Sequence, residues 1–329
     1  PWNYPAAMGT RKIAPALAAG CPVIIKPASE TPLTMLALMP LLEEAGVPKG
    51  LVNVLPSKNS GKLVDHMLHD PRVRVISFTG STQVGRKLLR SAADQIVKPA
   101  MELGGNAPLI IFEDADIDKA VDGAMLAKMR NLGEACTAAN RFYIHESVAP
   151  AFTSKFCAAM AALKLGNGLE DGVDVGPLVN ADTRDKVIAF VDDAVAKGAR
   201  VELGGTRPNG KGYFYPPTVL SNVSEDADCV HDEIFGPVAA LQSFTDEEDV
   251  IRRANNTEYG LVAYVFSEDM KRALRVCERL EYGMVGLNRG LVSDPAAPFG
   301  GVKQSGLGRE GGHEGMLEFM ETQYISAEW

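Results

Sequence analysis

Short apolar runs alternate with helix patterns along the chain, and this alternation constrains the fold more than any other feature of the sequence. Runs with the length and composition of buried strands are followed by segments that have the apolar spacing and the end signals of helices. A helix between two strands makes a crossover connection, and crossovers place the strands side by side in parallel. We therefore predict an α/β fold with parallel sheets. The predicted strands are residues 21–27, 51–56, 73–80, 107–112 and 141–146, and the predicted helices are residues 31–48, 81–94, 116–129 and 181–197.

The helix predicted at residues 31–48 has clear signals at both ends. Thr31 is expected to cap its N-terminus, with Pro32 at the first helical position, where a missing N–H group has no partner to lose. Gly46 indicates where the helix stops. Pro40 lies inside it, where proline removes one hydrogen bond and clashes with the preceding turn. We therefore expect a kinked helix that begins with Pro32.

The composition is that of an ordinary globular protein with a negative net charge. The chain has 329 residues, enough for two domains, and 46% of them are hydrophobic. The formal net charge of -9 argues against binding to nucleic acid or to an anionic membrane, because both require a basic surface. No apolar run approaches the roughly 20 residues of a membrane span. We expect neither nucleic acid nor a membrane among the partners.

The five cysteines do not have the pattern of a disulfide framework. They are odd in number and widely separated, and no CxxC sequence occurs. His66 and His69 could share one helical face, but no third ligand lies near them in the sequence, so we predict no metal site. This use of cysteine is typical of a reducing compartment, and we predict a cytoplasmic protein. The cysteines are Cys21, Cys136, Cys157, Cys229 and Cys277.

One cysteine differs from the others in its surroundings. Cys136 lies in "RNLGEACTAANR", residues 130–141, among small and polar neighbours without helical or strand periodicity. Small neighbours leave a thiol accessible, and backbone amides close to it stabilise a thiolate, so Cys136 suits a nucleophile. No histidine is near it in the sequence, which does not favour protease-like chemistry.

The segment "FTGSTQVG" is a candidate phosphate-binding turn. A predicted strand runs into Gly80, Ser81 begins a helix, and Gly85 follows one turn later. Amide groups at a helix N-terminus suit a phosphate group, and glycine allows close approach. The segment does not match GxGxxG, so an ordinary strand-to-helix turn remains an alternative.

Three further motifs hold candidate polar residues. Glu102 precedes two glycines in "MELGG" and is either a general base or a polar residue at a turn. Asn3 lies between prolines in "PWNYP", and "HDEIFGP" places Glu233 and Phe235 before a Gly-Pro turn. Each motif has a plain structural alternative, namely local hydrogen bonds in a loop or an acidic turn. Singly, none of them identifies a function.

Taken in order, these motifs resemble those of the aldehyde dehydrogenase superfamily. The ordered set is "PWNYP", "KPASETP", "FTGSTQVG", "MELGG", "GEACTAANR", "EIFGP" and "PFGGVKQSGLGREGG". The resemblance covers essentially the whole chain. Within the family, "RNLGEAC" and the tail that follows "GGVKQSGLGREGG" are most similar to the succinate-semialdehyde dehydrogenase branch.

The resemblance implies a covalent mechanism with three catalytic residues. Cys136 matches the family's nucleophile, which attacks the aldehyde carbon to give a thiohemiacetal. Asn3 matches the asparagine whose amide stabilises the oxyanion, together with the backbone N–H of Cys136. After hydride transfer to a nicotinamide, Glu102 would activate the water that hydrolyses the thioester. The implied reaction is oxidation of an aldehyde to a carboxylic acid.

The resemblance also implies a dinucleotide cofactor. Lys26 and Ser29, in "KPASE", match the residues that face the adenine ribose. Relatives that prefer NAD usually have glutamate in place of Ser29, because a carboxylate accepts the 2′-hydroxyl and repels a 2′-phosphate. Serine removes that repulsion and Lys26 adds a positive charge, so we predict NADP, with NAD as the alternative. The other residues matched to the cofactor site are Gly80, Ser81, Gly85, Glu233 and Phe235.

The predicted substrate is succinate semialdehyde. Arg11 and Arg130 match arginines that bind the distal carboxylate in the semialdehyde branch, and Ser293 matches a serine that assists them. The alternatives are two solvated arginines and a different aldehyde, such as glutarate semialdehyde or an uncharged one. A dinucleotide-binding fragment without catalysis is a third reading, because the family normally begins well before "PWNYP".

The resemblance implies two α/β domains and a C-terminal segment. Residues 1–103 are expected to form a Rossmann-type dinucleotide-binding domain that lacks the family's N-terminal part, and residues 104–310 the catalytic domain. Residues 311–329 are expected to be an oligomerisation segment with a strand near "ETQYIS", which predicts a homo-oligomer. Ala138 stands where some relatives have a second cysteine, so a disulfide between that position and Cys136 is excluded here.

Overall fold

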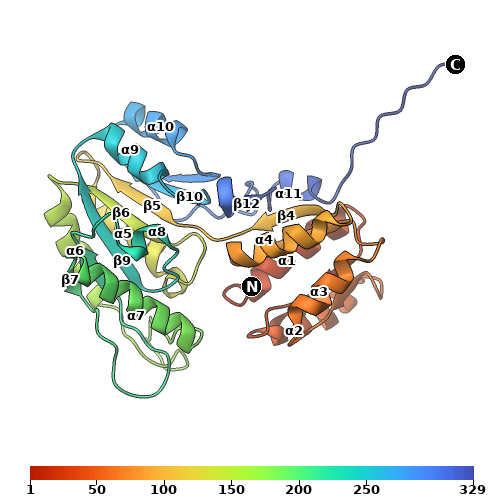
Figure 1. Cartoon of the computed structure of the whole chain (residues 1–329), viewed down its shortest axis with the longest axis horizontal. Coiled ribbons are helices and arrows are strands. Elements are labelled where there is room, and N and C mark those ends of the chain that lie inside the picture. Colours follow the sequence, from red (N-terminus) through yellow and green to blue (C-terminus); the bar gives the residue numbers. More distant parts are fainter. The chain divides into compact units, whose positions relative to one another are not determined.

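The computed structural model describes residues 1 to 329, and the chain forms two compact units (Figure 1). Unit 1 contains Pro1–Leu103, Ser293–Gly301 and Gly306–Trp329, and unit 2 contains Gly104–Val292 and Val302–Ser305. Residues 293–301 and 306–310, which we expected in the catalytic domain, are therefore part of unit 1. Gly306 and Leu307 are hydrogen-bonded to a strand of that unit, Phe299 pairs with Glu310, and Ser293 accepts a hydrogen bond from Arg11 of that unit. The functional names of the two domains stay predictions.

Unit 1 contains two small sheets. Strands β1 and β2 form a parallel pair, and β3 and β4 form another to which β12 adds in antiparallel orientation. Thr79, the last residue of β3, is in register with Glu102, the last residue of β4. The C-terminal ends of both strands therefore lie at the same end of this sheet. The elements are α1 (Pro5–Ala18), β1 (Val23–Ile25), α2 (Pro32–Glu44), β2 (Val52–Val54), α3 (Ser60–Leu68), β3 (Val75–Thr79), α4 (Thr82–Ala93), β4 (Lys98–Glu102), β12 (Gly306–Leu307) and α11 (Glu314–Leu317).

Unit 2 is built on a seven-stranded sheet in the order β11-β10-β5-β6-β9-β8-β7. All of its pairings are parallel except that of the edge strand β7 with β8. Every residue of β5 and β10 is buried, as expected of a parallel sheet with both faces covered. The elements are β5 (Ala107–Ile111), α5 (Ile117–Met129), the 3-10 helix η1 (Arg130–Gly133), β6 (Ala139–His145), α6 (Ala149–Ala161), α7 (Ala181–Ala196), β7 (Arg200–Leu203), β8 (Thr218–Ser221), α8 (Asp228–His231), β9 (Val238–Phe244), α9 (Glu247–Asn255), β10 (Val262–Phe266), α10 (Met270–Arg279), β11 (Met284–Leu287) and the 3-10 helix η2 (Lys303–Ser305).

The α/β fold predicted from the sequence is confirmed, and each strand and helix predicted from apolar spacing is present. Two details differ. The prediction of parallel strands fails for β7 and β12, which are antiparallel. Helix α2 begins with Pro32 as predicted, but the Thr31 side chain does not cap it, and its Oγ1 is buried without a hydrogen-bond partner.

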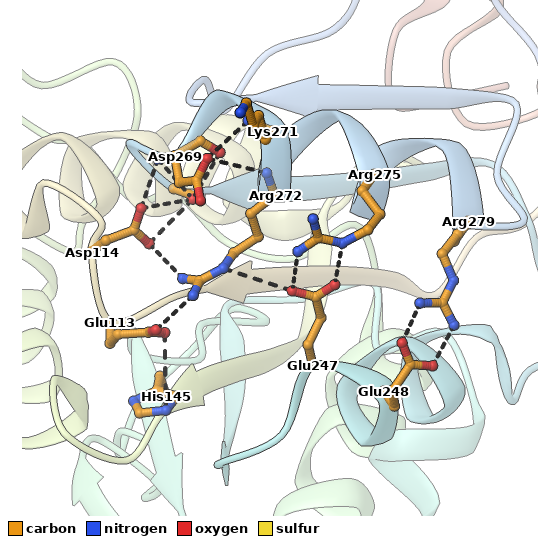
Figure 2. A network of polar contacts seen from close by, with 11 residues as sticks. Glu113, Asp114, His145, Glu247, Glu248, Asp269, Lys271, Arg272, Arg275 and Arg279 are labelled. Atoms are coloured by element: carbon orange, nitrogen blue, oxygen red, sulfur yellow. Dashed lines mark hydrogen bonds and ion pairs between the residues drawn. The ribbon is translucent and has the colours of Figure 1, made fainter.

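Ion pairs join the segment after the C-terminal end of β5 to α9 and α10 at the surface of unit 2 (Figure 2). Arg272 of α10 donates to Glu113 at 2.8 Å and to Asp114 at 3.0 Å, just beyond the end of β5. Arg275 donates two hydrogen bonds to Glu247 at the start of α9, with N···O distances of 2.7 and 2.8 Å. We call the charged residues of Figure 2 the surface ion-pair network, which consists of Glu113, Asp114, His145, Glu247, Glu248, Asp269, Lys271, Arg272, Arg275 and Arg279. It connects α9 and α10 to the loop that follows β5 and carries Glu113.

The C-terminal residues differ from the expected strand. After α11 the chain has no helix or strand, and Tyr324 and Ile325 are exposed. A strand requires a hydrogen-bonded neighbour, so pairing of residues 321–326 with a second chain stays a prediction. No helix in the structure has the length and apolar character needed to cross a membrane.

Candidate active site

The loop that carries Cys136 begins with an unusual backbone reversal. Helix α5 ends at Met129, and Asn131, Leu132 and Gly133 follow with φ angles of 52°, 61° and 75°. The left-handed region is costly for residues with a Cβ atom, by about 1–2 kcal/mol each. The Asn131 side chain donates to the Glu134 carbonyl at 3.0 Å, and the Glu134 N–H donates to the Asn131 carbonyl at 2.9 Å. These two hydrogen bonds close the reversal. We call residues 130–137 the nucleophile loop.

The backbone at Cys136 is fixed by contacts of its own carbonyl and of its neighbour Thr137. A Cβ atom on Gly105 would lie 2.5 Å from the Cys136 carbonyl oxygen, so only glycine allows this close approach. Thr137 is fixed twice, because the Tyr264 hydroxyl donates to its carbonyl at 2.8 Å and Arg130 donates to its Oγ1 at 3.2 Å. The Cys136 thiol is partly exposed. A positioned, accessible thiol on a rigid loop is the arrangement that a nucleophile requires.

Three titratable groups in or near this loop in unit 2 have shifted pKa values. Burial raises the pKa of Glu134 to about 7, although the hydrogen bond from the Val179 N–H opposes the shift. Burial also raises the pKa of Glu233 to about 7, and its Oε1 accepts the Gly105 N–H at 3.1 Å. Lys128 is fully buried, which lowers its pKa to about 7. Gly105 thus donates its N–H to the Glu233 carboxyl and lies against the Cys136 carbonyl oxygen.

In unit 1, Glu102 lies at the end of β4 with both carboxyl oxygens buried and without a hydrogen-bond partner. Burial, and then the negative charge of Glu310, raises the pKa of Glu102 to about 9. A Cβ atom on Gly300 would lie 2.8 Å from Glu102 Oε1, so the chain passes close to the carboxyl. Once it is ionised, a buried carboxylate with such a high proton affinity is suited to remove a proton from water.

Lys12 and Glu310 form an ion pair that was not predicted from the sequence, with side chains that are 12% and 6% exposed. The Lys12 ammonium also donates to Thr79 Oγ1 at 2.6 Å. Glu310 Oε2 is buried without a partner. The two residues are 298 positions apart, so their contact could not be found from local sequence, although Lys12 directly follows the predicted Arg11. Both groups act on the Glu102 pKa, in opposite directions.

The structure brings Arg11 and Ser293 together in unit 1. Arg11 Nη2 donates to Ser293 Oγ at 2.6 Å, across 282 residues of sequence. The guanidinium also lies over the Phe299 ring, 4.4 Å from its centroid. Arg11 Nη1 is buried without a hydrogen-bond partner. Arg130 belongs to unit 2, and its share in the predicted carboxylate clamp stays a prediction.

The residues predicted to face the adenine ribose follow β1, and their hydrogen-bond partners follow β2, the parallel neighbour of β1. Lys26 donates from Nζ to Ser60 Oγ at 3.1 Å, and burial lowers the pKa of Lys26. The Ser29 hydroxyl donates to the Ser57 carbonyl at 3.4 Å. The carboxyl ends of parallel strands are where dinucleotides bind in open α/β sheets. Binding of an adenine ribose by Lys26 and Ser29 stays a prediction.

The predicted phosphate turn lies between β3 and α4. Ser81 caps α4 by accepting the Val84 N–H at 3.4 Å, and Gly80 donates its N–H to the Glu102 carbonyl at 3.0 Å. Gly85 has a packing reason, since a Cβ atom there would lie 2.5 Å from the Leu103 side chain. The turn thus presents a helix N-terminus beside Glu102. Asn3 precedes α1 in the same unit, and Phe235 has a φ angle of 54° in unit 2.

Comparison with known proteins extends these observations. A model of the aldehyde dehydrogenase family matches residues 1–325. The succinate-semialdehyde dehydrogenase of Paenarthrobacter nicotinovorans is 55% identical over 325 residues, which are 99% of this chain and 72% of that protein. The glutarate-semialdehyde dehydrogenase of Pseudomonas putida is 49% identical, again over 99% of this chain and over 67% of its own length.

A solved structure agrees with this result. The crystal structure of an NADP-dependent enzyme from Escherichia coli superposes with a TM-score of 0.97 at 49% identity, and the match covers 99% of this chain and 67% of that one. The chain thus spans about two thirds to three quarters of the length of these relatives. The family resemblance predicted from seven ordered motifs is confirmed. The chain belongs to the aldehyde dehydrogenase family.

Proposed function

We propose that this protein oxidises succinate semialdehyde to succinate, with NADP as the hydride acceptor, through a thioester on Cys136. The observation that carries the substrate is Arg11. Its guanidinium has a hydroxyl and an aromatic ring as neighbours, and its Nη1 is buried without a partner. A guanidinium in such a place is suited to bind a carboxylate, and a semialdehyde has one at its far end.

The chemistry begins at Cys136. Its thiolate adds to the aldehyde carbon, and the Asn3 amide and the Cys136 N–H would stabilise the resulting oxyanion. The collapse of the thiohemiacetal releases a hydride and leaves a thioester on sulfur. When bound, the nicotinamide supplies the acceptor for that hydride. Water, deprotonated by Glu102, then attacks the thioester carbon, which releases the carboxylic acid and returns the thiolate.

The residues matched to the family's cofactor site would hold the dinucleotide. Lys26 and Ser29 would face the adenine ribose, where an ammonium group attracts a 2′-phosphate and Ser29 stands in place of the glutamate that repels it in relatives that prefer NAD. The α4 N-terminus, with Gly80, Ser81 and Gly85, would face the phosphates. Glu233 and Phe235 would hold the nicotinamide ribose and ring. The similarity to an NADP-dependent enzyme from Escherichia coli supports this assignment.

Arg130 and Ser293 would complete the carboxylate clamp around Arg11. A second candidate substrate is glutarate semialdehyde, which the relative from Pseudomonas putida is named for. It has the same carboxylate and one more methylene group, so the clamp by itself does not separate the two. One methylene group changes specificity by about 10- to 200-fold in a fitted pocket. We favour succinate semialdehyde because the relative from Paenarthrobacter nicotinovorans, named for it, is the more similar of the two.

Steady-state kinetics of the full-length protein test the proposal. We expect the highest kcat/KM with succinate semialdehyde and NADP, a lower value with glutarate semialdehyde, and a much lower one with butanal. Equal values for succinate semialdehyde and butanal would overturn the substrate. Cys136→Ala should abolish turnover and keep cofactor binding, measured by fluorescence titration, whereas Cys157→Ala, at a partly exposed cysteine outside the site, should keep both. Turnover by Cys136→Ala would refute the thioester mechanism.

A further inference from the structure

Glu134 connects the nucleophile loop to a different part of unit 2. It lies two residues before Cys136, and it is only 4% exposed although it is a carboxylic acid. Its Oε1 accepts the Val179 N–H at 3.1 Å, across 45 residues of sequence. A buried carboxyl beside a nucleophile has a cost in stability, so its retention calls for a reason. The proposed chemistry assigns it no role.

The partner of Glu134 is itself firmly held. Leu178, which is 2% exposed, packs in the core that contains α7, and its N–H donates to the Tyr213 carbonyl at 3.1 Å. Asn180 caps α7, since its Oδ1 accepts the Thr183 N–H at 2.9 Å. The Val179 N–H therefore lies between a core residue and a helix cap. It is a rigid donor.

The nucleophile loop needs such an anchor. Its reversal contains Asn131 and Leu132 in the left-handed region, which asparagine tolerates and leucine does not favour. A Cβ atom on Gly133 would lie 2.3 Å from the Gly236 carbonyl, so the loop is also pressed against a neighbouring segment. Backbone in a costly conformation persists only when surrounding contacts determine it. On the Cys136 side of the reversal, the first side chain to reach another segment is that of Glu134.

We propose that Glu134 is a positioning residue that sets the place of the Cys136 thiol by binding the nucleophile loop to the N-terminus of α7. The carboxyl accepts the Val179 N–H, and this hydrogen bond keeps Ala135 and Cys136 at the end of a reversal that would otherwise relax. The inference rests on the proposed function, in which Cys136 is the nucleophile. It makes the acceptor atom, and not the negative charge, the important property of the side chain.

Two substitutions separate the acceptor from the charge. Glu134→Gln keeps an oxygen acceptor and the side-chain length but removes the charge, and Glu134→Ala removes both. In the full-length protein, we measure the rate of Cys136 alkylation by iodoacetamide, with the rate of Cys136→Ala subtracted, and the burst of reduced cofactor in the first turnover. We expect Glu134→Ala to lower the burst rate roughly ten- to a hundredfold and to change the alkylation rate, because small displacements of a nucleophile have large effects. Glu134→Gln should stay within about threefold of the wild type in both.

A control separates positioning from general loss of stability. Val250→Ala removes buried methyl groups from α9, in the core below the surface ion-pair network, and should lower Tm without changing either rate. If Glu134→Ala lowered Tm as Val250→Ala does and left both rates at the wild-type value, the proposal would be wrong. It would also be wrong if Glu134→Gln were as impaired as Glu134→Ala. Should the alanine variant not fold, Glu134→Asp, whose shorter side chain cannot reach Val179, takes its place with the same expectations.

The two proposals can fail separately. Alkylation reports the position and environment of the thiol whether or not Cys136 forms a thioester. A changed alkylation rate in Glu134→Ala, combined with turnover by Cys136→Ala, would support the positioning role and refute the proposed function. An unchanged alkylation rate together with an inactive Cys136→Ala would refute the positioning role and leave the proposed function standing.

Discussion

Carboxyl groups in the surface ion-pair network and at the candidate active site have opposite environments. In the network, Arg275 holds the pKa of Glu247 below its ordinary value, and Arg279 does the same for Glu248 (Figure 2). At the site, burial raises the pKa of Glu102 to about 9 and that of Glu134 to about 7. The first group is ionised throughout the neutral pH range. The second group changes its protonation within or above that range.

This difference shows what each region does with its charge. Surface carboxylates that meet arginines remain solvated, so they join α9 and α10 to the sheet at little cost. A buried carboxyl without a hydrogen-bond partner, such as Glu102, lowers stability but gains proton affinity. A general base works best when its pKa lies near the working pH. The buried carboxyl at the candidate site therefore lowers the stability of the fold, whereas the carboxylates of the surface ion-pair network do not.

The arginines repeat the contrast. Arg272 in the network donates to Glu113 and Asp114, and its charge is neutralised within the protein. Arg11 donates to the Ser293 hydroxyl and lies over Phe299, neither of which is negatively charged. An arginine whose charge is satisfied in the fold has a structural role. Arg11, whose hydrogen-bond and ring partners are neutral and whose charge also acts to lower the pKa of Glu102, can bind an anionic substrate.

The largest expected effect concerns Glu102. Glu102→Gln removes the base and should slow thioester hydrolysis roughly 10²- to 10⁴-fold, whereas acylation continues. A stopped-flow trace of reduced cofactor should therefore show a burst followed by a slow steady state. If burst and steady state fell equally, Glu102 would act in an earlier step, and its buried carboxyl would need another explanation.

A smaller effect is expected at Arg11. Arg11→Ala should lower kcat/KM for succinate semialdehyde roughly ten- to a hundredfold, because a charge-assisted hydrogen bond contributes about 1.5–3 kcal/mol. Butanal has no carboxylate, so its kcat/KM should change far less. Arg130→Ala should behave in the same way. The measurement is a parallel kinetic comparison of the two substrates.

Arg272→Ala is the matched control for the arginine variants, since it removes an arginine of the surface ion-pair network. It should leave kcat/KM for both substrates near the wild-type value. Equal losses on both substrates in Arg11→Ala would mean a damaged fold, and no loss on either would make Arg11 a structural residue like Arg272.

The sequence predicts what depends on neighbouring residues. The strands and helices that were predicted were found because their apolar spacing is local, and Cys136 and Glu102 were found because each lies in a short motif. Other strands were not predicted, among them β12, because two residues next to a glycine give no periodicity and their partner β4 lies about two hundred positions earlier. The prediction for Thr31 was right in position and wrong in chemistry, because a capping hydrogen bond depends on a side-chain torsion.

The missed parts of the candidate site are contacts between distant residues. Lys12 and Glu310 are 298 positions apart, and Glu134 and Val179 are 45 apart. Nothing in either sequence segment indicates its partner. Burial is likewise a property of the folded chain, so the raised pKa values of Glu102 and Glu134 could not be inferred from the amino-acid sequence.

The smallest expected effect tests the two kinds of carboxyl group by their pH dependence. Glu134 has a folded-state pKa of about 7, above the ordinary value of 4.5, so its ionisation destabilises the folded state as the pH rises through that range. Relative to the wild type, Glu134→Gln should therefore gain about 1–2 kcal/mol of unfolding free energy between pH 5 and pH 8.

Glu247 should behave in the opposite way. Its folded-state pKa lies below 4.5, chiefly because Arg275 donates to it, so its contribution to stability is present above pH 4.5 and is lost as the pH falls through the folded-state pKa. Glu247→Gln should be less stable than the wild type by at most about 1 kcal/mol from pH 5 to pH 8, because solvent screens a pair near the surface. This deficit should shrink below pH 4.5 and also in high salt, which weakens exposed ion pairs. Urea unfolding of both variants at pH 4, 5, 6, 7 and 8 makes the comparison. If the Glu134→Gln difference were flat between pH 5 and pH 8, as we expect for Glu247→Gln, the carboxyl of Glu134 would be ionised like a surface group, and the contrast between the two regions would fail there.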